Sequence, residues 1–238
     1  MCEHFIARAS EPFRLEELWP FTERLERFGI AGFGWGAAWI GDDEDLQSYR
    51  DLHAFRDAPG MAELGAITTT TALVHLRRPS KLSTLTVADT QPFDDPAGRY
   101  ALSHNGDLRD YRTLRATYRA QGRIHGRADT EVGARWLEDA WDPAAPPASQ
   151  LEALHDQFGG RANLALLTSD GRPFHYAGND ENPVFTFRLG RIGVASTGIY
   201  SLDRSLFHLV APEATERRLV RVGHAVTLDR DGSARTQA

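Results

Sequence analysis

The pattern of hydrophobic and polar positions divides the chain into strand-like and helix-like stretches. Residues 2–9 alternate loosely between polar and apolar side chains, which predicts a short first strand. Apolar residues then recur at near-helical spacing from Leu15 to Phe28, and Gly29 is a typical helix end. Because Pro20 lies inside that stretch, we expect the helix to begin near it or to be broken there.

The rest of the chain continues with strands, then helices, then more strands. Glycines alternate with aromatic residues in a predicted strand over 32–40, and the acidic run 42–45 is typical of an exposed hairpin connection. Further strands are predicted at 46–49, 70–76, 99–103, 162–168, 173–177, 183–187, 192–196 and 225–228. Helices are predicted at 52–55, 108–120, 129–141 and 149–158. This order favours an α+β layered domain in which one sheet packs on another.

Composition and charge narrow the class of protein. Of 238 residues, 41% are hydrophobic and 25% charged, which is ordinary for a soluble globular protein and sufficient for one domain over residues 2–238. A formal net charge of −6 argues against nucleic acid or an anionic membrane as the main partner. The chain has no run of about 18 apolar residues and no apolar signal-peptide core near its start. With one cysteine, these features predict a cytoplasmic protein.

That cysteine, Cys2, directly follows Met1. It has no intrachain disulfide partner, and a four-thiolate zinc site is impossible, so burial as a small hydrophobe and catalysis are the interpretations left. If Met1 is removed, a free α-amine lies beside the thiol. Their pKa values are ordinarily about 8 and about 8.5, so the amine can take the thiol proton at neutral pH. Cys2 is therefore a candidate nucleophile that carries its own base.

Two polar pairs follow predicted strands, and each has a structural and a functional interpretation. Arg77 and Arg78 fit an exposed strand end or an anion-binding site. Asn105 and Gly106 fit a tight turn. They also supply a side-chain amide and a backbone N–H that can point at one spot, which is the donor pair of an oxyanion hole.

A third polar position opens the helix predicted over 129–141. Asp129 or Thr130 is expected to cap that helix, which is the structural alternative to a role in binding. Nine histidines are scattered through the chain without an i, i+4 pair or a His-Glu-x-x-His motif, so we predict no metal and no other cofactor.

Six short motifs occur in a characteristic order along the chain. They are Cys2 after Met1, Gly34-Trp35-Gly36, His75-x-Arg77-x-x-Ser80, Gln91-Pro92-Phe93, His104-Asn105-Gly106-Asp107-Leu108 and Asp129-Thr130-Glu131. Together they resemble class II glutamine amidotransferase domains over residues 2 to about 200, and among these the stand-alone type similar to the ergothioneine-pathway amidohydrolase. The resemblance implies an N-terminal-nucleophile hydrolase, folded as a four-layer αββα sandwich of two antiparallel sheets.

The resemblance also implies a role for each matched residue. Cys2 would attack the side-chain amide carbon of glutamine or of a γ-glutamyl compound and form a γ-glutamyl thioester. Asn105 Nδ2 and the Gly106 N–H would stabilise the oxyanion. Arg77 would bind the substrate α-carboxylate, and Asp129 its α-ammonium group.

Two positions depart from the family pattern. Ser80 stands where many members have threonine and keeps the hydroxyl, so it is expected to contact the substrate. Gln91 stands where many have histidine. Because an amide does not titrate, Gln91 is expected to have a structural or substrate-contact role.

The fate of the released amine has two alternatives. Ammonia would pass to a separate synthase subunit, since the segment after residue 200 is too short to be an acceptor domain. Otherwise the enzyme hydrolyses a γ-glutamyl amide whose amine is larger than ammonia. The expected ligand is glutamine or a γ-glutamyl small molecule, and a homo-oligomer is a further expectation.

Two other functions compete with this interpretation. An acylase-type hydrolase would share the fold, but Arg77 and Asp129 speak against it because an acyl chain needs no charged anchors. A catalytically silent binding or regulatory protein would be favoured if Met1 stayed attached, since an acylated nitrogen on Cys2 is not a base.

Overall fold

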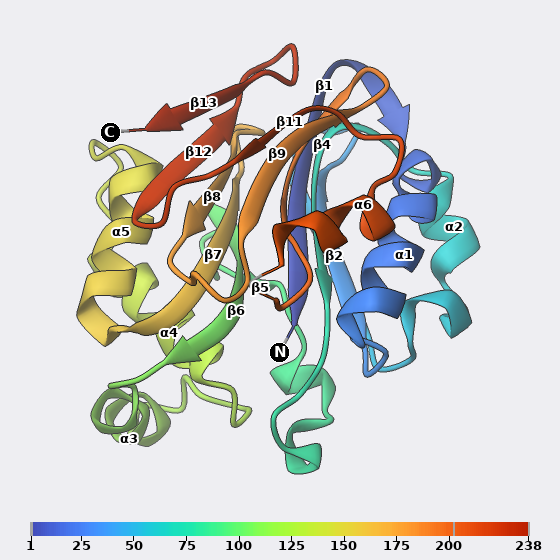
Figure 1. Cartoon of the computed structure of the whole chain (residues 1–238). Coiled ribbons are helices and arrows are strands. Elements are labelled where there is room, and N and C mark those ends of the chain that lie inside the picture. The colour runs from blue at the N-terminus through green and yellow to red at the C-terminus, as the bar shows by residue number, and fades with distance from the viewer. Residues whose placement is uncertain (1, 202, 238) are drawn as a thin grey trace.

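Two antiparallel sheets pack face to face between two layers of helices in the computed structural model of the chain, which describes residues 2–201 and 203–237 (Figure 1). Met1, whose removal would free the Cys2 amine, and the last residue of the predicted domain 2–238 lie outside the described residues. The strand orders are β11-β9-β10-β1-β4-β2-β3 and β13-β12-β8-β7-β6-β5. The predicted α+β fold, a four-layer αββα sandwich, is confirmed.

The first sheet contains both the N-terminal strand and the strand that leads to Arg77. Its strands are β1 (Glu3–Arg14), β2 (Trp35–Ile40), β3 (Leu46–Asp51), β4 (Thr68–Leu76), β9 (Val184–Leu189), β10 (Ile192–Thr197) and β11 (Thr215–Leu219). The helices on its outer side are α1 (Trp19–Gly29), α2 (Met61–Gly65) and α6 (Phe207–Val210). The ring of Phe21 on α1 packs edge-on against Phe5 at 5.1 Å and Phe187 at 5.3 Å, which joins helix to sheet.

The second sheet carries the predicted oxyanion motif. Its strands are β5 (Phe93–Asp94), β6 (Tyr100–Leu108), β7 (Gly160–Thr168), β8 (Pro173–Ala177), β12 (His224–Leu228) and β13 (Ala234–Gln237). Its outer face is covered by α3 (Arg112–Ala120), α4 (Asp129–Ala140) and α5 (Pro147–Phe158). Leu151, Leu154 and Phe158 of α5 are fully buried in one core cluster with Leu164 and Leu166 of β7.

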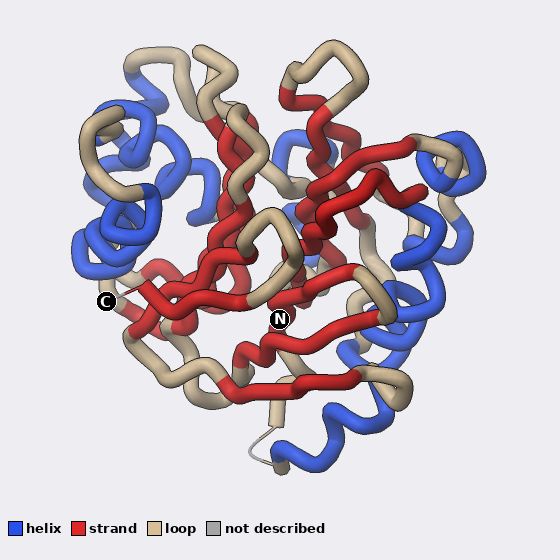
Figure 2. The backbone as a smooth tube through the Cα atoms, turned by 90° about the horizontal axis from the view of Figure 1, so that it is seen from above, coloured by secondary structure: helices blue, strands red, loops and turns tan. Residues whose placement is uncertain are grey.

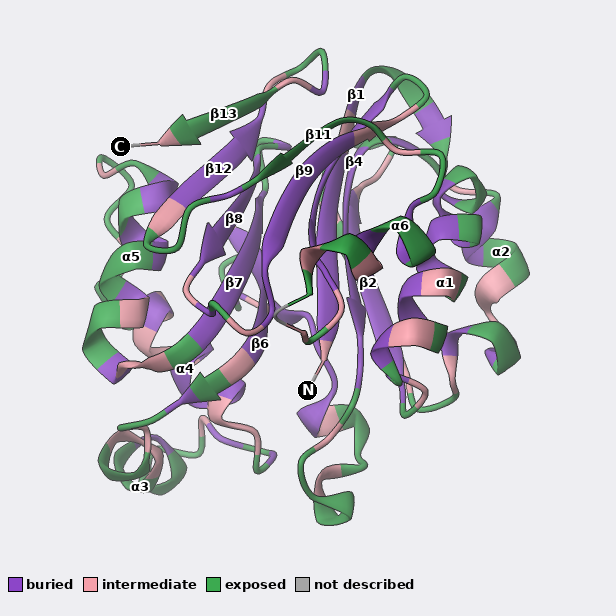
Figure 3. Ribbon diagram, in the orientation of Figure 1, coloured by how far each residue is buried: buried purple, intermediate pink, exposed green. Residues whose placement is uncertain are grey.

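A separate apolar layer lies between the sheets. Ile6, Leu73, Leu167 and Val226 meet there and are shielded from solvent. Full burial of such side chains contributes about 1.5–3 kcal/mol each, so this layer holds the sheets together. In Figure 3 the central strands are buried while the outward helix faces are exposed, and Figure 2 shows the helices along the two outer sides of the strands.

Short 3₁₀ turns complete the chain: η1 (Leu15–Leu18), η2 (Phe55–Asp57), η3 (Leu82–Thr84), η4 (Val87–Asp89) and η5 (Arg204–Leu206). The helix predicted at 52–55 is wrong, because the chain bends there and the helical turn begins only at Phe55. The prediction also missed α2, α6, β5, β11 and β13. β11 is exposed along its whole length, so no alternation of burial marks it in the sequence.

Candidate functional site

A cavity of about 850 Å³ opens where several segments distant in sequence meet. Its wall comes from the start of β1, the loop after β4, the end of β6, the loop before α4 and the start of β7. In Figure 1 the N end, α3 and the loop after β4 all lie toward the lower end of the molecule. Six of the predicted site residues line this cavity: Cys2, Arg77, Ser80, Gln91, Gly106 and Asp129. The remaining one, Asn105, is wholly buried in the strand beside them.

Strand register places Cys2 in the cavity wall. Glu3 of β1 pairs with Leu76 of β4, so the preceding residue lies beside the end of β4. The Arg78 backbone N–H donates to Cys2 Sγ at 3.4 Å, and the thiol lies 3.8 Å from the Arg78 carbonyl oxygen. Burial raises the pKa of the Cys2 thiol. The thiol is therefore protonated at neutral pH, and its use as a nucleophile requires a neighbouring base.

Asn105 and Gly106 lie inside β6 and form no turn, so the tight-turn interpretation is wrong. Asn105 is paired in register with Asn163 of β7, and neither its Nδ2 nor its Oδ1 has a hydrogen-bond partner among the described residues. A buried amide without partners costs about 1–3 kcal/mol, so proteins rarely keep one without a function. This amide lies between His104 and Gly106 in sequence, both of which line the cavity.

Gly106 has a backbone conformation that excludes other residues. Its φ is +132°, and a Cβ at this position would lie 1.9 Å from the Arg161 carbonyl oxygen of the neighbouring strand. Only glycine fits both the angle and the close approach of the two strands. The same position exposes its backbone to the cavity beside Asn105.

Arg77 is buried and holds the loop that follows it. Its guanidinium donates to the Thr86 carbonyl oxygen at 3.3 Å, to Thr90 Oγ1 at 3.1 Å and to the Thr84 carbonyl oxygen. Three of its five N–H donors are thus used, and Nε has no partner among the described residues. The exposed-strand-end interpretation is wrong for Arg77 but holds for Arg78, whose side chain is exposed.

Asp129 is the first residue of α4 and does not cap it. The N-cap is Ala128, without a side-chain cap bond, so the capping interpretation is wrong for Asp129 and for Thr130. The Asp129 carboxylate accepts the backbone N–H groups of Leu108 and Thr130, both at 2.9 Å, and its Oδ1 lies 4.0 Å from His104 Nδ1. These bonds fix an anion in the cavity wall and leave lone pairs for a cationic ligand group.

Gln91 and Ser80 line the cavity in different ways. Gln91 Nε2 donates to the His104 carbonyl oxygen at 3.1 Å, and the His104 N–H donates to Gln91 Oε1 at 2.6 Å. Both ends of the amide are therefore bonded to β6, which favours the structural role for Gln91. The Ser80 side chain is exposed in the wall, and no described residue bonds to it.

Asp89 is a functional candidate that the sequence analysis missed. It is buried, and its carboxylate accepts the N–H groups of Arg127 and Ala128, the latter at 2.7 Å, and the Thr86 hydroxyl at 2.9 Å. It therefore links the loop held by Arg77 to the residues directly before Asp129. No local signal marks Asp89, because its main partners are 38 and 39 residues away.

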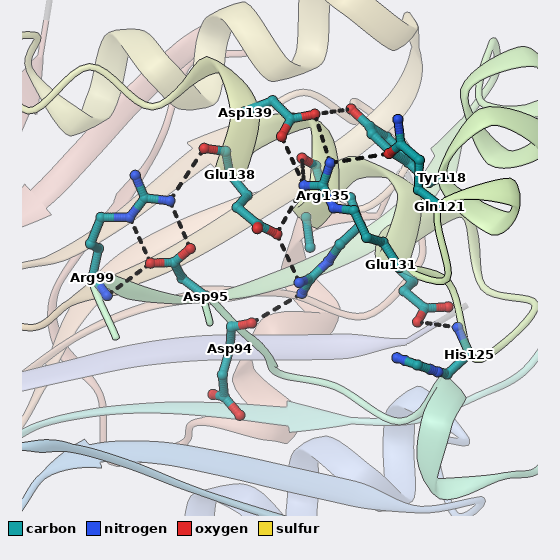
Figure 4. A network of polar contacts seen from close by, with 12 residues as sticks. Asp94, Asp95, Arg99, Tyr118, Gln121, His125, Glu131, Arg135, Glu138 and Asp139 are labelled. Carbon is teal, nitrogen blue, oxygen red and sulfur yellow. Dashed lines mark hydrogen bonds and ion pairs between the residues drawn. The ribbon is translucent and has the colours of Figure 1, made fainter. Parts of the chain in front are cut away.

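A polar network fixes the same loop from the other side. Glu131 of α4 accepts the N–H groups of His125 and Gly126 at 2.7 and 2.8 Å. Figure 4 shows the further contacts of this network: Arg135 with Glu138 at 2.8 Å, Tyr118 with Asp139 at 2.8 Å and Arg99 with Asp95 at 2.6 Å. These contacts join α3, α4 and the β5 region, so the backbone before Asp129 is held from both sides.

Glu3, next to the nucleophile candidate, is enclosed by a second polar group. Asn182 Nδ2 donates to its carboxyl oxygens at 3.1 and 3.2 Å, and Thr197 Oγ1 donates at 2.5 Å. Burial raises the Glu3 pKa to about 8. Asn163 Nδ2 in turn donates to the Asn182 carbonyl oxygen at 2.7 Å. Asn163, which pairs with Asn105 in register, thereby connects β7 with the polar group around Glu3.

Three histidines fill the space between the sheets behind the cavity. His4 and His75 contact Ser103 Oγ through Nδ1 at 2.8 and 2.9 Å, and the rings of His4 and His175 are 4.6 Å apart. Burial lowers the pKa of all three, so they are neutral at pH 7. Among residues 2–201 and 203–237, no group of three or more His, Cys, Asp or Glu is arranged to hold a metal ion.

Sequence comparison assigns the family. The profile described as glutamine amidotransferase domain matches residues 77–198, which are 122 of the 238 residues. The chain belongs to the glutamine amidotransferase domain family. The resemblance to glutamine amidotransferase domains predicted from the six motifs is confirmed, although the matched segment begins at Arg77 and does not include Cys2. No curated protein matches the chain significantly.

Solved structures share this fold. Glutamine phosphoribosylpyrophosphate amidotransferase from B. subtilis, complexed with ADP and GMP, superposes with a TM-score of 0.73 at 19% identity. The match covers 99% of this chain and 49% of that one. A structure described as the allosteric regulatory enzyme of purine biosynthesis gives 0.72 at 18%, covering 99% and 48%. This amidotransferase domain therefore spans about half the length of both.

A third similar structure has nearly the same length as this chain. It is a glutamine aminotransferase class-II domain protein from Silicibacter pomeroyi, with a TM-score of 0.58, 18% identity and 98% coverage of both chains. At these identities the likeness shows the fold alone. In the described part of this chain, no helix is long and apolar enough to span a membrane.

Proposed function

We propose that this amidotransferase domain hydrolyses the side-chain amide of glutamine or of a γ-glutamyl compound through a thioester on Cys2. The observation that carries the proposal is the wholly buried, unpartnered amide of Asn105 between His104 and Gly106, both of which line a cavity that also contains the chain's one cysteine. A nucleophile and an oxyanion hole are the minimum that acyl transfer requires.

The first half of the reaction forms the thioester. After Met1 is removed, the Cys2 α-amine takes the proton of the thiol, whose burial-raised pKa otherwise keeps it protonated. Sγ attacks the amide carbon, and the oxygen gains negative charge that Asn105 Nδ2 and the Gly106 N–H stabilise. The carbon–nitrogen bond then breaks, and the leaving amine takes the proton held by the α-ammonium group.

The second half releases glutamate. Water, deprotonated by the same α-amine, attacks the thioester carbon, the carbon–sulfur bond breaks, and the thiol regains its proton. Throughout, the unused N–H donors of Arg77 bind the substrate α-carboxylate, and Asp129 pairs with its α-ammonium group. One cation and one anion match the head group of a free amino acid.

The proposal is tested by mixing the purified protein with glutamine and with γ-glutamyl amides and measuring glutamate. We expect release that Cys2→Ala abolishes while the unfolding midpoint stays unchanged, because the loss is chemical. Removal of Met1 is checked by intact mass in both proteins. Equal glutamate release by Cys2→Ala would overturn the proposal.

A further inference from the structure

The cavity is larger than an amino acid needs and is charged opposite to the chain. Its volume of about 850 Å³ lies in the upper part of the range of about 300–1,000 Å³ for small-molecule sites. Its wall contains seven Lys or Arg residues but four Asp or Glu residues, whereas the whole chain has a net charge of −6. The wall therefore carries a net positive charge in a chain that is negative as a whole.

Five of these cations have no carboxylate within ion-pair distance in the described part of the chain. They come from three separate segments: Arg78 and Lys81 after β4, Arg109 after β6 with Arg112 at the start of α3, and Arg127 before α4. All five side chains belong to exposed residues, in contrast to the buried Arg77. These five cations therefore lie on the solvent side of the cavity wall, and Arg77, the predicted anchor of the glutamyl head group, is more deeply buried.

The acidic residues of the wall form their hydrogen bonds and ion pairs with other groups. Asp89 and Asp129 accept backbone N–H groups, and Glu181 pairs with Arg161, which is itself one of the seven cations. Of the four acidic residues in the wall, Asp107 alone has no described ion-pair or side-chain hydrogen-bond partner. Like charges brought together destabilise the fold, so an unpaired group of cations around a cavity is expected to serve an anionic ligand.

We propose that the amine part of the substrate carries an anionic group, a carboxylate or a phosphate. This inference rests on the proposed function and specifies its substrate class: an acidic γ-glutamyl amide is preferred to glutamine and to neutral γ-glutamyl amides. Water cleaves the amide, the glutamyl group leaves as glutamate, and the product amine keeps its anion and takes a proton. The inner anchors hold the glutamyl head group, and the outer cations hold the leaving amine.

The test compares γ-glutamyl-glycine with γ-glutamyl-glycinamide, which differ only by the anionic carboxylate. We expect kcat/KM to be about tenfold or more higher for the acid, since a hydrogen bond to a charged group contributes about 1.5–3 kcal/mol. Added salt should reduce this preference because it screens exposed charges. γ-Glutamyl-phosphoethanolamine as a third substrate shows whether phosphate or carboxylate is preferred.

Charge-removing variants locate the effect. In the double variant Arg109→Gln/Arg112→Gln, kcat/KM for γ-glutamyl-glycine should fall to the value for γ-glutamyl-glycinamide. The value for γ-glutamyl-glycinamide should stay within about twofold of the wild type, since its neutral amine part makes no charged contact. Arg172→Gln, an exposed arginine outside the cavity that pairs with Asp170, is the matched control and should change neither rate. An unchanged acid-to-amide ratio in the double variant would overturn the inference.

Equilibrium binding to Cys2→Ala separates this inference from the proposed function. The inference is supported if γ-glutamyl-glycine binds more tightly than its amide and this difference is lost in the Arg109/Arg112 double variant. This holds even if the wild type hydrolyses neither compound, a result that would contradict the proposed function alone. If the two compounds bind equally well and Cys2-dependent hydrolysis is intact, only the inference is refuted. That result would favour an acidic surface of a partner subunit as the ligand of the cations. No binding of either refutes the inference.

Discussion

Asn105 and Gly106 are neighbours in one strand, and each is unusual for a different reason. Gly106 is required by the backbone, because its φ and its distance to Arg161 leave no room for a side chain. Asn105 is unfavourable for folding, because its buried amide has no partner among the described residues. A residue that costs stability at the edge of a cavity is expected to contribute to function there.

Asn105→Ala separates these two effects. We expect kcat to fall by about 100- to 1,000-fold with little change in KM, since an oxyanion exists mainly in the transition state. Stability should stay unchanged or rise, because the variant removes an unpartnered polar group. Steady-state kinetics and chemical denaturation of the same preparations measure both. A large loss of stability, or an effect confined to KM, would contradict the oxyanion role.

Arg77 and Arg78 offer a second comparison between neighbours. Arg77→Lys should raise KM more than Arg78→Lys does, because lysine cannot keep the three loop bonds and also offer a fork to a carboxylate. It should also lower the unfolding midpoint, whereas Arg78→Lys should not. The reverse order of KM effects would identify Arg78 as the carboxylate anchor.

At the scale of the secondary-structure elements, two loops position the charged residues of the site. The loop after β4 is held by Arg77 and the loop before α4 by Glu131, and Asp89 joins the two. The proposed carboxylate anchor, Arg77, and the proposed ammonium anchor, Asp129, are thus connected through one buried side chain. Asp89 is therefore expected to act as a positioning residue.

Asp89→Ala should increase hydrogen exchange of the Arg127 and Ala128 amides and raise KM with a smaller effect on kcat, because the anchors lose their relative position. Asp89→Asn keeps an acceptor oxygen, so its hydrogen exchange and its KM should lie between those of the alanine variant and the wild type. Asp107→Asn, an exposed carboxylate in the same wall, is the control. Unchanged exchange at residues 127 and 128 in Asp89→Ala would contradict the coupling.

Elements and motif residues were predictable from sequence to different degrees. Buried strands bounded by turns, such as Pro173–Ala177, were predicted with the observed bounds, and five short or exposed elements were not. Six motif residues line one cavity, as their family order suggested. Asp89 and the unpaired state of Asn105 were not predictable, because both depend on contacts with distant segments.

At the scale of the whole molecule, the layer between the sheets and the region beside it contain groups whose pKa values differ between folded and unfolded chains. Glu3 is protonated in the fold up to about pH 8 but ionises near 4.5 when unfolded. The buried histidines stay neutral in the fold, while the unfolded chain protonates them below about pH 6.5. The two sets give pH dependences of opposite sign.

Glu3→Gln tests the first set. In the wild type, unfolding releases the Glu3 proton above its unfolded pKa, so the Glu3 contribution to stability should fall as pH rises from about 6.5 to about 8, and the histidines titrate alike in the wild type and the variant. The variant should show a flatter profile over that window. Denaturation midpoints across the window measure it, and identical slopes would show that Glu3 is ionised in the fold.

His175→Gln tests the second set. The pKa of His175 is lowered to about 3, so its contribution to stability is fully present above about pH 6.5 and is lost progressively as pH falls from about 6.5 toward 3. Removing it should lessen the loss of stability between about pH 6.5 and 5, most clearly in a Glu3→Gln background. An unchanged slope there would mean that His175 is protonated in the fold.

The account depends most directly on Cys2 as the acyl carrier. The decisive measurement is the intact mass of protein quenched in acid during turnover of a γ-glutamyl substrate, followed by mapping of the N-terminal peptide. We predict a γ-glutamyl group on Cys2 in chains that lack Met1, with none in Cys2→Ala. Glutamate release by the wild type without this adduct, or an adduct elsewhere on the chain, would contradict the role of Cys2.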